Sequence, residues 1–261
     1  MRALILCLLF LCIGCSAVTH EKERTFQDAQ LAFDAGNYRQ AAAMYGQLLE
    51  QGVRSGAVYY NLGNAWAKAD EPVNAIAAYY LAKRYIPNDS RLNTNLSTVL
   101  KNNGGTPPPS DSSLMGSILF WQDWIGTHAK IWISIVLSAL TFLGGTLCLF
   151  QKNRRQCHRS TIALAILTTI ALVSVGYDWY RFEWVAHVIV TKDVVPRKGN
   201  SEQYEPAFVS PIPFGTLAVI LDERAGWVSL RFPNGQEGWL PQSQTFLIRE
   251  QTTMSPHPRL P

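Results

Sequence analysis

Hydrophobic and polar positions fall into four successive patterns along the chain. An uncharged apolar run covers residues 3–18, and hydrophobic positions then recur at helical spacing over residues 22–103. Two further uncharged runs cover residues 131–150 and 160–177, and from residue 185 onward hydrophobic and polar positions alternate. These patterns predict a targeting segment, a set of amphipathic helices, two membrane-spanning helices and a small all-β domain.

The first eighteen residues predict a secretory signal peptide. Arg2 precedes the apolar run, and the small residues Cys15-Ser16-Ala17 lie near its end. Residues 11–15 also resemble a bacterial lipobox, whose last residue, Cys15, would carry the lipid. Plain cleavage and lipidation at Cys15 both remain open.

The two later apolar runs are long enough to cross a bilayer. Residues 131–150 and 160–177 contain no charge, and twenty helical residues at about 1.5 Å each span ~30 Å, the thickness of the hydrocarbon core. Either run could instead be the core helix of a large soluble domain. Because no other segment is extensive enough to surround them, we expect two transmembrane helices.

Basic residues beside the two spans predict their orientation. The turn 151–159 holds four Lys or Arg and no acid, whereas the outer flanks hold Lys130 and Arg181. Since basic loops stay on the cytoplasmic side, the turn is expected in the cytoplasm and both flanking regions in the periplasm. Residues 104–130 are expected to be a linker followed by an interfacial, tryptophan-containing segment, and residues 251–261 a disordered tail.

Composition and charge exclude several classes of protein. Charged residues make up only 16% of the 261 residues and apolar residues 48%, which excludes intrinsic disorder for the chain as a whole. The turn 151–159 alone carries a charge of +4, which equals the net charge of the whole chain. Positive and negative charges balance elsewhere, so no basic surface for nucleic acid is expected. The segments expected to fold in water lack cysteine, which excludes a disulfide framework and thiolate metal sites there.

A period of 34 residues runs through the helical segment. The residues that recur are Ala41 and Ala75, Tyr45 and Tyr79, and Leu48 and Ala82. Together with Leu62-Gly63 and Trp66 they resemble the tetratricopeptide repeat (TPR), in which helix pairs stack. The resemblance implies an all-α repeat domain over residues 22–103, with Trp66 and Tyr79 in its core and residues 90–101 as a capping helix. Two and a half repeats are near the lower limit for stability, since about three are usually needed.

TPR domains commonly hold an extended peptide on the first helix of each pair. Counted from repeat starts at residues 22, 56 and 90, the peptide-facing positions are Phe26, Gln30, Tyr60, Asn64, Lys68, Arg91 and Asn95. Tyr60, Asn64 and Lys68 share one helical face because they lie four residues apart. An ordinary solvated surface would carry similar residues, so peptide binding is a hypothesis that the repeat alone does not establish.

The C-terminal alternation predicts short antiparallel strands joined by tight turns. Arg224-Ala225-Gly226 and Asn234-Gly235 separate the alternating segments. Asn-Gly is typical of a two-residue hairpin turn, because both residues accept a positive φ.

Two tryptophan motifs in this region resemble bacterial SH3-like domains. They are Gly226-Trp227-Val228 and Gly238-Trp239-Leu240. The resemblance implies a small all-β barrel over residues 185–250 that binds peptide or cell-wall material in an aromatic groove formed by Tyr204, Trp227 and Trp239. The alternative is that these aromatic residues fill the core of the barrel.

The order of the modules resembles that of the BatE-like proteins of the bacterial aerotolerance (Bat) operon. Residues 59–96, with Tyr60-Asn61-Leu62-Gly63-Asn64 and Pro87-Asn88-Asp89, are close to the repeat sequence of that family. The resemblance implies a multidomain inner-membrane protein that associates with von Willebrand factor A-domain Bat proteins and a MoxR-type ATPase system. It also implies a role in oxygen or stress tolerance.

The sequence holds no motif of an enzyme. Five histidines are scattered, with no H-x-x-x-H, no glycine-rich phosphate loop and no G-x-S-x-G. We therefore expect a non-enzymatic protein without cofactor or metal. Two functions remain, a scaffold that binds proteins through its periplasmic modules and a peptidoglycan-binding sensor that acts through the SH3-like domain.

Overall fold

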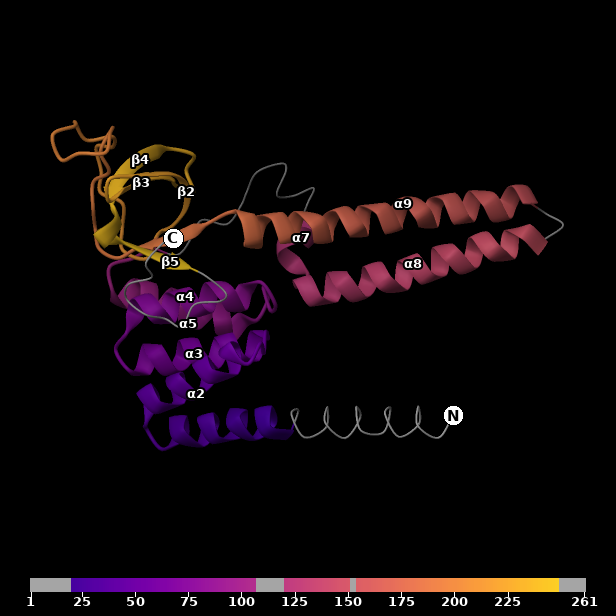
Figure 1. Ribbon diagram of the computed structural model, residues 1–261, viewed down its shortest axis with the longest axis horizontal. Coiled ribbons are helices and arrows are strands. Elements are labelled where there is room, and N and C mark those ends of the chain that lie inside the picture. The colour runs from indigo at the N-terminus through magenta and orange to yellow at the C-terminus, as the bar shows by residue number, and fades with distance from the viewer. Residues whose placement is uncertain (1–19, 107–119, 151–153, 249–261) are drawn as a thin grey trace, which may run out of the picture.

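Helical and extended backbone occupy separate parts of the chain. The computed structural model describes residues 20–106, 120–150 and 154–248, so the expected signal segment with Cys15, residues 107–119 of the linker and the tail at residues 251–261 lie outside the described residues. The described chain is mostly helical, with one antiparallel sheet of five strands. Two long helices project as a hairpin from the stacked helices and the sheet (Figure 1).

Five helices stack in the N-terminal part of the chain. They are residues 20–34, α2 (Tyr38–Glu50), α3 (Gly56–Lys68), α4 (Pro72–Lys83) and α5 (Ser90–Asn102). The starts of α2 and α4 are 34 residues apart, as are those of α3 and α5. We call this unit the helical repeat.

Local residue choices explain where these helices begin and end. Ser55 caps α3 by accepting a hydrogen bond from Val58 N, and Asp89 caps α5 in the same way. Residues 34 apart end the first helix of each pair in a left-handed conformation, with φ of 81° at Gly36 and 61° at Asp70. Asp70 can replace glycine there because its short polar side chain tolerates this conformation better than most.

Small and large side chains fit together in the core of the helical repeat. Trp66 packs against both hydrophobic clusters of the unit, and Tyr79 is 1% exposed, which confirms their expected core positions. The Tyr79 ring lies directly over Gly63, where a Cβ atom would come within 2.5 Å of Cε1. Glycine at this position therefore lets α3 and α4 approach closely.

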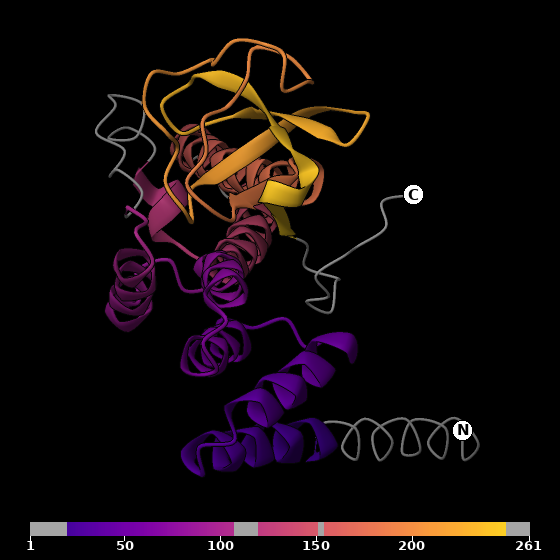
Figure 2. The ribbon, with the colours of Figure 1, turned by 90° about the vertical axis from the view of Figure 1, so that its left-hand side faces the viewer.

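The sheet forms a separate layer with its own core. Its strands are β1 (His187–Val190), β2 (Leu217–Arg224), β3 (Trp227–Arg231), β4 (Glu237–Pro241) and β5 (Thr245–Ile248), in the order β4-β3-β2-β1-β5. Figure 2 shows the sheet curling beside the helices. Its inner face buries Val188, Val190, Val228, Leu230 and Leu240.

One hairpin turn differs from the expectation. The two-residue turn with positive φ at both positions is Ala225-Gly226, not Asn234-Gly235. At the second hairpin only Gly235 has a positive φ, and the Phe232 and Gln236 backbones close a longer loop. Pro233 accounts for the difference, because it favours the first central position of an ordinary turn and moves the reversal one residue earlier.

The projecting hairpin consists of α8 (Thr127–Phe150) and α9 (Arg154–Trp179), preceded by the short α7 (Phe120–Trp124). A π-helical turn, Tyr180–Trp184, joins α9 to the sheet. Both helices are long and apolar enough to cross a membrane. Only 11% of the most apolar 18-residue stretch of each helix is buried within the protein. They are therefore not core helices of the described domains.

The helices that contain the expected spans of residues 131–150 and 160–177 are longer than those spans. α8 begins at Thr127, and α9 begins at Arg154, within the expected turn. The helices extend past the charged residues because Lys130 is buried in the hairpin rather than solvated at its end, while arginine is a good helix former at the far end.

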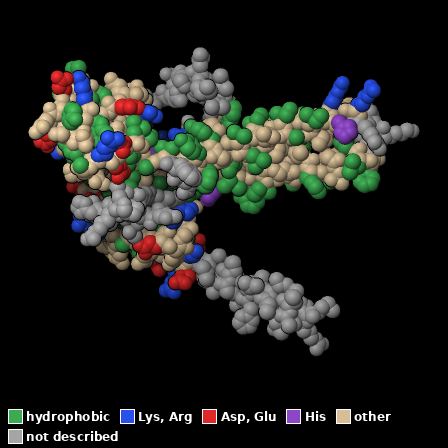
Figure 3. Space-filling model, turned by 45° about the horizontal axis from the view of Figure 1, so that its top comes forward, with side chains coloured by type: hydrophobic (Ala, Val, Ile, Leu, Met, Phe, Trp, Pro, Cys, Tyr) green, Lys and Arg blue, Asp and Glu red, His purple; other side chains and the backbone are tan. Residues whose placement is uncertain are grey.

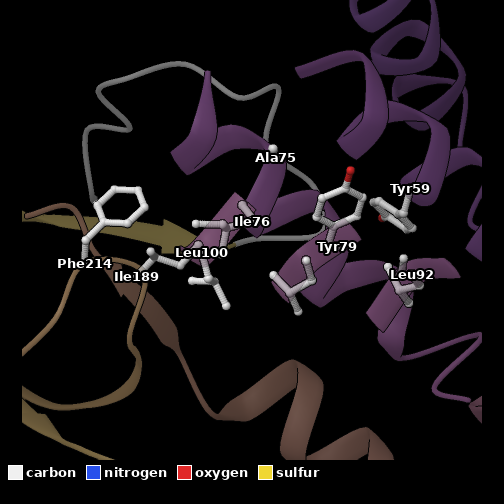
Figure 4. Close-up of a cluster of buried hydrophobic side chains, with 11 residues drawn as sticks. Tyr59, Ala75, Ile76, Tyr79, Leu92, Leu100, Ile189 and Phe214 are labelled. Carbon is white, nitrogen blue, oxygen red and sulfur yellow. The ribbon is translucent and has the colours of Figure 1, made fainter. Parts of the chain in front are cut away.

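The sheet completes the core of the helical repeat. Ile189 of β1 and Phe214 belong to the same buried cluster as Ile76 and Leu100 (Figure 4). The sheet therefore covers part of the surface of α4 and α5 that a further helix pair of the repeat would otherwise bury. The repeat and the sheet form one continuous hydrophobic unit.

Gly63→Ala is expected to destabilise the protein by about 1–3 kcal/mol, because the added methyl group overpacks the contact with Tyr79. Thermal unfolding of the purified chain in detergent, followed by circular dichroism, measures the effect. Gly46→Ala is the matched control, since Gly46 lies within α2 with nothing within 4 Å of a Cβ. It should raise stability by up to ~1 kcal/mol through helix propensity. Equal melting of the two variants would contradict this packing.

Candidate functional site

Three of the expected peptide-facing residues meet between α3 and α5. The Asn95 amide nitrogen donates hydrogen bonds to the Tyr60 hydroxyl at 3.1 Å and to Asn64 Oδ1 at 2.8 Å. The Tyr79 hydroxyl, from α4, donates to the same Asn64 oxygen at 2.9 Å. We call Tyr60, Asn64, Tyr79 and Asn95 the amide cluster.

Burial turns Tyr79 into a fixed donor within this cluster. Desolvation raises the pKa of its hydroxyl well above the ordinary value of 10, so the hydroxyl stays protonated. Among the described residues, neither the Asn64 amide nitrogen nor the Asn95 side-chain oxygen makes a hydrogen bond. The two amides thus retain one donor and one acceptor, the complement of a peptide unit.

Cationic side chains lie beside the amide cluster. The Arg91 guanidinium lies 5.7 Å from the centre of the Tyr60 ring, and Arg91 Nη2 lies 2.8 Å from Asp89 Oδ2. The hydrogen bond from Arg91 holds the pKa of the Asp89 carboxyl below its ordinary value of 3.8. Lys68 is exposed in the last turn of α3. Because Asp89 compensates the Arg91 charge, Lys68 is the side chain of the two that would favour an acidic segment of a partner.

The remaining expected positions lie away from the amide cluster. The expectation that Phe26 faces a bound peptide is wrong. Its ring packs edge to face on Tyr45, with 5.6 Å between the ring centres, and belongs to the core of the first helix pair. Gln30 is exposed on the helix of residues 20–34, and no hydrogen bond among the described residues joins it to the cluster. The first pair departs from the repeat sequence at its first helix, so position counting fails there.

Two tryptophans occupy the outer face of the sheet. Trp227 pairs with Pro241 and Trp239 with Ser229 across β3 and β4, so both tryptophans lie on the same face, opposite the buried Val228. The alternative in which they fill the core is therefore wrong. Burial of the valine and leucine at the intervening positions leaves the two tryptophans on the other face, where they are only partly buried.

Tyr204 lies in the long loop beside this aromatic face. Its side chain is 50% exposed, and Arg197 connects it to β4. The Arg197 guanidinium donates to the Tyr204 carbonyl at 3.3 Å, while Arg197 N donates to the Trp239 carbonyl at 2.9 Å. The Arg224 guanidinium stacks 5.9 Å from the Trp239 ring centre. We call the surface of β3 and β4 that carries Trp227 and Trp239 the aromatic face; the contacts above join Tyr204 to it only through Arg197.

A buried polar network at the base of the long hairpin escaped the sequence analysis. Lys130 Nζ lies 2.9 Å from Asp178 Oδ2, and each side chain is only 4% exposed. Thr127 donates to the Asp178 carboxylate at 2.9 Å, and Lys130 donates to Gln122 Oε1 at 2.8 Å. Ser174 donates to the same glutamine oxygen at 2.9 Å.

The spacing of polar residues was the available signal for this network. Thr127, Lys130 and Ser134 recur three or four residues apart on α8, and Ser174 and Asp178 lie four apart on α9. Such spacing places each set on one helical face. Lys130 was expected on the outer flank of a span, whereas the structure places it inside the hairpin.

The helical repeat is fixed to this base by direct contacts. Thr127 N donates to the Arg84 carbonyl at 3.0 Å, and Asn88 Nδ2 donates to the Trp124 carbonyl at 2.7 Å. The Tyr85 and His128 rings meet edge to face at 4.8 Å. The amide cluster is therefore held at a set position relative to the hairpin.

Neither metal geometry nor known relatives assign a chemistry to these features. Within residues 20–106, 120–150 and 154–248, no group of three or more His, Cys, Asp and Glu could hold a metal ion. A scan of protein-family models finds no family that matches the chain, and a search of curated proteins finds no match either.

Lys130→Met is expected to destabilise the protein by about 3–5 kcal/mol, because it leaves the Asp178 carboxylate buried without its cation. The double variant Lys130→Met/Asp178→Leu should lose much less, since an apolar pair can replace a buried ion pair at little cost. Thermal unfolding in detergent compares the two variants. A double variant as unstable as the single one would show that the pair is not coupled as described.

Proposed function

We propose that the chain is a non-enzymatic, two-span scaffold of the bacterial inner membrane that holds an extended peptide segment of a protein partner on its amide cluster. The observation that carries the proposal is the unused donor of Asn64 beside the unused acceptor of Asn95. A peptide backbone satisfies both groups at once. Because the two amides are partly buried, hydrogen bonds from a peptide to them are stronger than they would be in water.

The 34-residue spacing of the helices supports a TPR unit, and peptide capture on the first helix of each pair is common in TPR domains. The curled five-stranded sheet supports an SH3-like module. Two long apolar helices with basic residues at their tip (Figure 3) support insertion with the tip in the cytoplasm and both folded modules in the periplasm.

The partner assignment rests on the BatE-like order of the modules. On that resemblance, the partners are von Willebrand factor A-domain Bat proteins and a MoxR-type ATPase system, in an aerotolerance or stress complex. No cofactor or metal is required. Bilayer lipid surrounds the hairpin, whose exposed surface is largely apolar.

A second candidate function is supported by the aromatic face. Two partly buried tryptophans on one side of a sheet can stack on sugar rings or proline-rich peptides. In this reading the chain is a peptidoglycan-binding sensor. The aromatic face lies on β3 and β4, whereas the sheet contacts the helical repeat through β1 and Phe214, so both surfaces could act independently.

The double variant Lys68→Ala/Asn95→Ala tests the scaffold. Asn64 is kept, because its loss would leave the buried Tyr79 hydroxyl without an acceptor. Removing two contacts of about 1 kcal/mol each should lower partner recovery from solubilised membranes tenfold or more. Recovery is quantified by mass spectrometry after affinity capture of the full chain.

The matched control for this test is Lys101→Ala/Asn93→Ala, which removes the same two residue types from other faces of α5. Both variants should remain folded by circular dichroism, with the free energy of unfolding lowered by about 1–2 kcal/mol, because Asn95 and Asn93 each lose hydrogen bonds of their own. If the amide-cluster variant still recovers every partner at the parental level, the scaffold proposal fails at this surface.

The sensor reading predicts that the purified full chain sediments with peptidoglycan and that Trp227→Ala/Trp239→Ala abolishes the effect. Val209→Ala, at a fully exposed loop position, is the control. Point changes are required because removing residues 185–250 would also remove Ile189 and Phe214 from the core of the helical repeat. Sedimentation that is absent in the parent chain, or unchanged by the tryptophan variant, would reject the sensor.

A further inference from the structure

A disulfide joins the two ends of the long hairpin. Cys148, in the last turn of α8, is bonded to Cys157, in the first turn of α9, and their Cα atoms lie 5.6 Å apart. This pair was not predicted from the sequence. It lies at the opposite end of the hairpin from the Lys130–Asp178 network, so the two helices are tied at both ends.

A permanent disulfide is not expected at the proposed location of this bond. The orientation proposed above places the basic tip in the cytoplasm, where thiol systems keep cysteines reduced and disulfides are usually transient. Yet the packing of α8 on α9 brings the two sulfurs to bonding distance. A bond that forms and breaks with the redox state is compatible with both the proposed orientation and the observed bond.

The two sulfurs differ in access. Cys148 is 1% exposed, and its sulfur lies 3.4 Å from the Thr161 hydroxyl. Cys157 is partly exposed and lies among Arg155, His158 and Arg159, which are exposed. Exchange with an external thiol must therefore begin at Cys157, with Cys148 as the second, internal partner.

We infer that Cys148 and Cys157 form a reversible thiol–disulfide couple that exchanges with acidic low-molecular-weight thiols and disulfides of the cytoplasm. The exposed cations around Cys157 attract such anionic compounds at low ionic strength. This inference depends on the proposed orientation only for the compartment, and it is independent of the amide cluster.

The exchange balances in two steps. In oxidation, Cys157 loses its proton and attacks one sulfur of the external disulfide, which releases one thiol and leaves a mixed disulfide on Cys157. Cys148 then loses its proton and attacks the Cys157 sulfur, which releases the second thiol. Overall, the two cysteines lose two electrons and two protons to the external disulfide, and reduction reverses both steps.

The purified full chain in detergent tests the couple with oxidised and reduced glutathione as probes. Free cysteines are counted by gel shift after alkylation with a polyethylene glycol maleimide. Reduced glutathione should expose both tip thiols, and excess oxidised glutathione should remove at least nine tenths of that signal. Cys148→Ser/Cys157→Ser should show neither change. A bond that reduced glutathione leaves intact in the folded chain, or thiols that never pair in oxidised glutathione, would overturn the inference.

Single variants test the order of attack. Cys148→Ser should retain a glutathione adduct on Cys157, measured as added mass in the intact chain, whereas Cys157→Ser should acquire none on Cys148. Arg155→Gln/Arg159→Gln should slow oxidation by glutathione disulfide several-fold but leave oxidation by neutral 2-hydroxyethyl disulfide unchanged. Equal adducts on both single variants would overturn the assigned order.

Labelling in cells separates this inference from the proposed function. A membrane-permeant maleimide should capture both tip thiols in growing cells, and an impermeant one should capture them only after the inner membrane is opened. Capture by the impermeant reagent in intact cells would overturn the orientation. Partner recovery by the Cys148→Ser/Cys157→Ser variant should match the parent, because the amide cluster lies on the helical repeat, beyond the other end of the hairpin.

Discussion

The ion pair between Lys130 and Asp178 is the contact on which the placement of the other parts depends. An ammonium and a carboxylate that are 4% exposed must be paired, because leaving either one alone in a buried site costs several kcal/mol. Their pairing sets the register of α8 on α9, and Gln122 extends the same network to α7. The helical repeat then docks on this base through Arg84 and Asn88. A polar interaction thus orients a water-facing unit relative to two apolar helices.

The second constraint is the shared core of the helical repeat and the sheet. A repeat of two and a half helix pairs buries too little surface alone, and about three pairs are usually needed. Ile189 and Phe214 supply apolar surface against α4 and α5, so the sheet takes the place of a missing neighbour. Because both modules share this core, the amide cluster and the aromatic face keep a fixed spatial relation, and neither module can be removed without exposing the other.

The functional surfaces lie on separate parts of this framework. The amide cluster holds two partly buried side-chain amides in place through a buried tyrosine hydroxyl, and their unused groups match a peptide backbone. The aromatic face lies on β3 and β4, whereas the sheet docks through β1 and Phe214. The cysteine pair is at the far tip of the hairpin, where basic side chains gather (Figure 3). Each surface can therefore be altered with little effect on the others.

Local spacing was enough to predict the helices, the strands, the two apolar spans and the core positions of Trp66 and Tyr79, because hydrophobic periodicity reports directly which side of an element is buried. Counting from the repeat starts, on the resemblance to TPR domains, also selected Tyr60, Asn64 and Asn95. Contacts between elements distant in the chain were decided only by the tertiary structure. Lys130 and Asp178 are 48 residues apart, and each reads alone as a charged flank of a span. The core position of Phe26, the outward position of the tryptophans and the Cys148–Cys157 bond have the same cause. The neighbours of a side chain depend on which elements pack together, and the periodicity along one element does not show this.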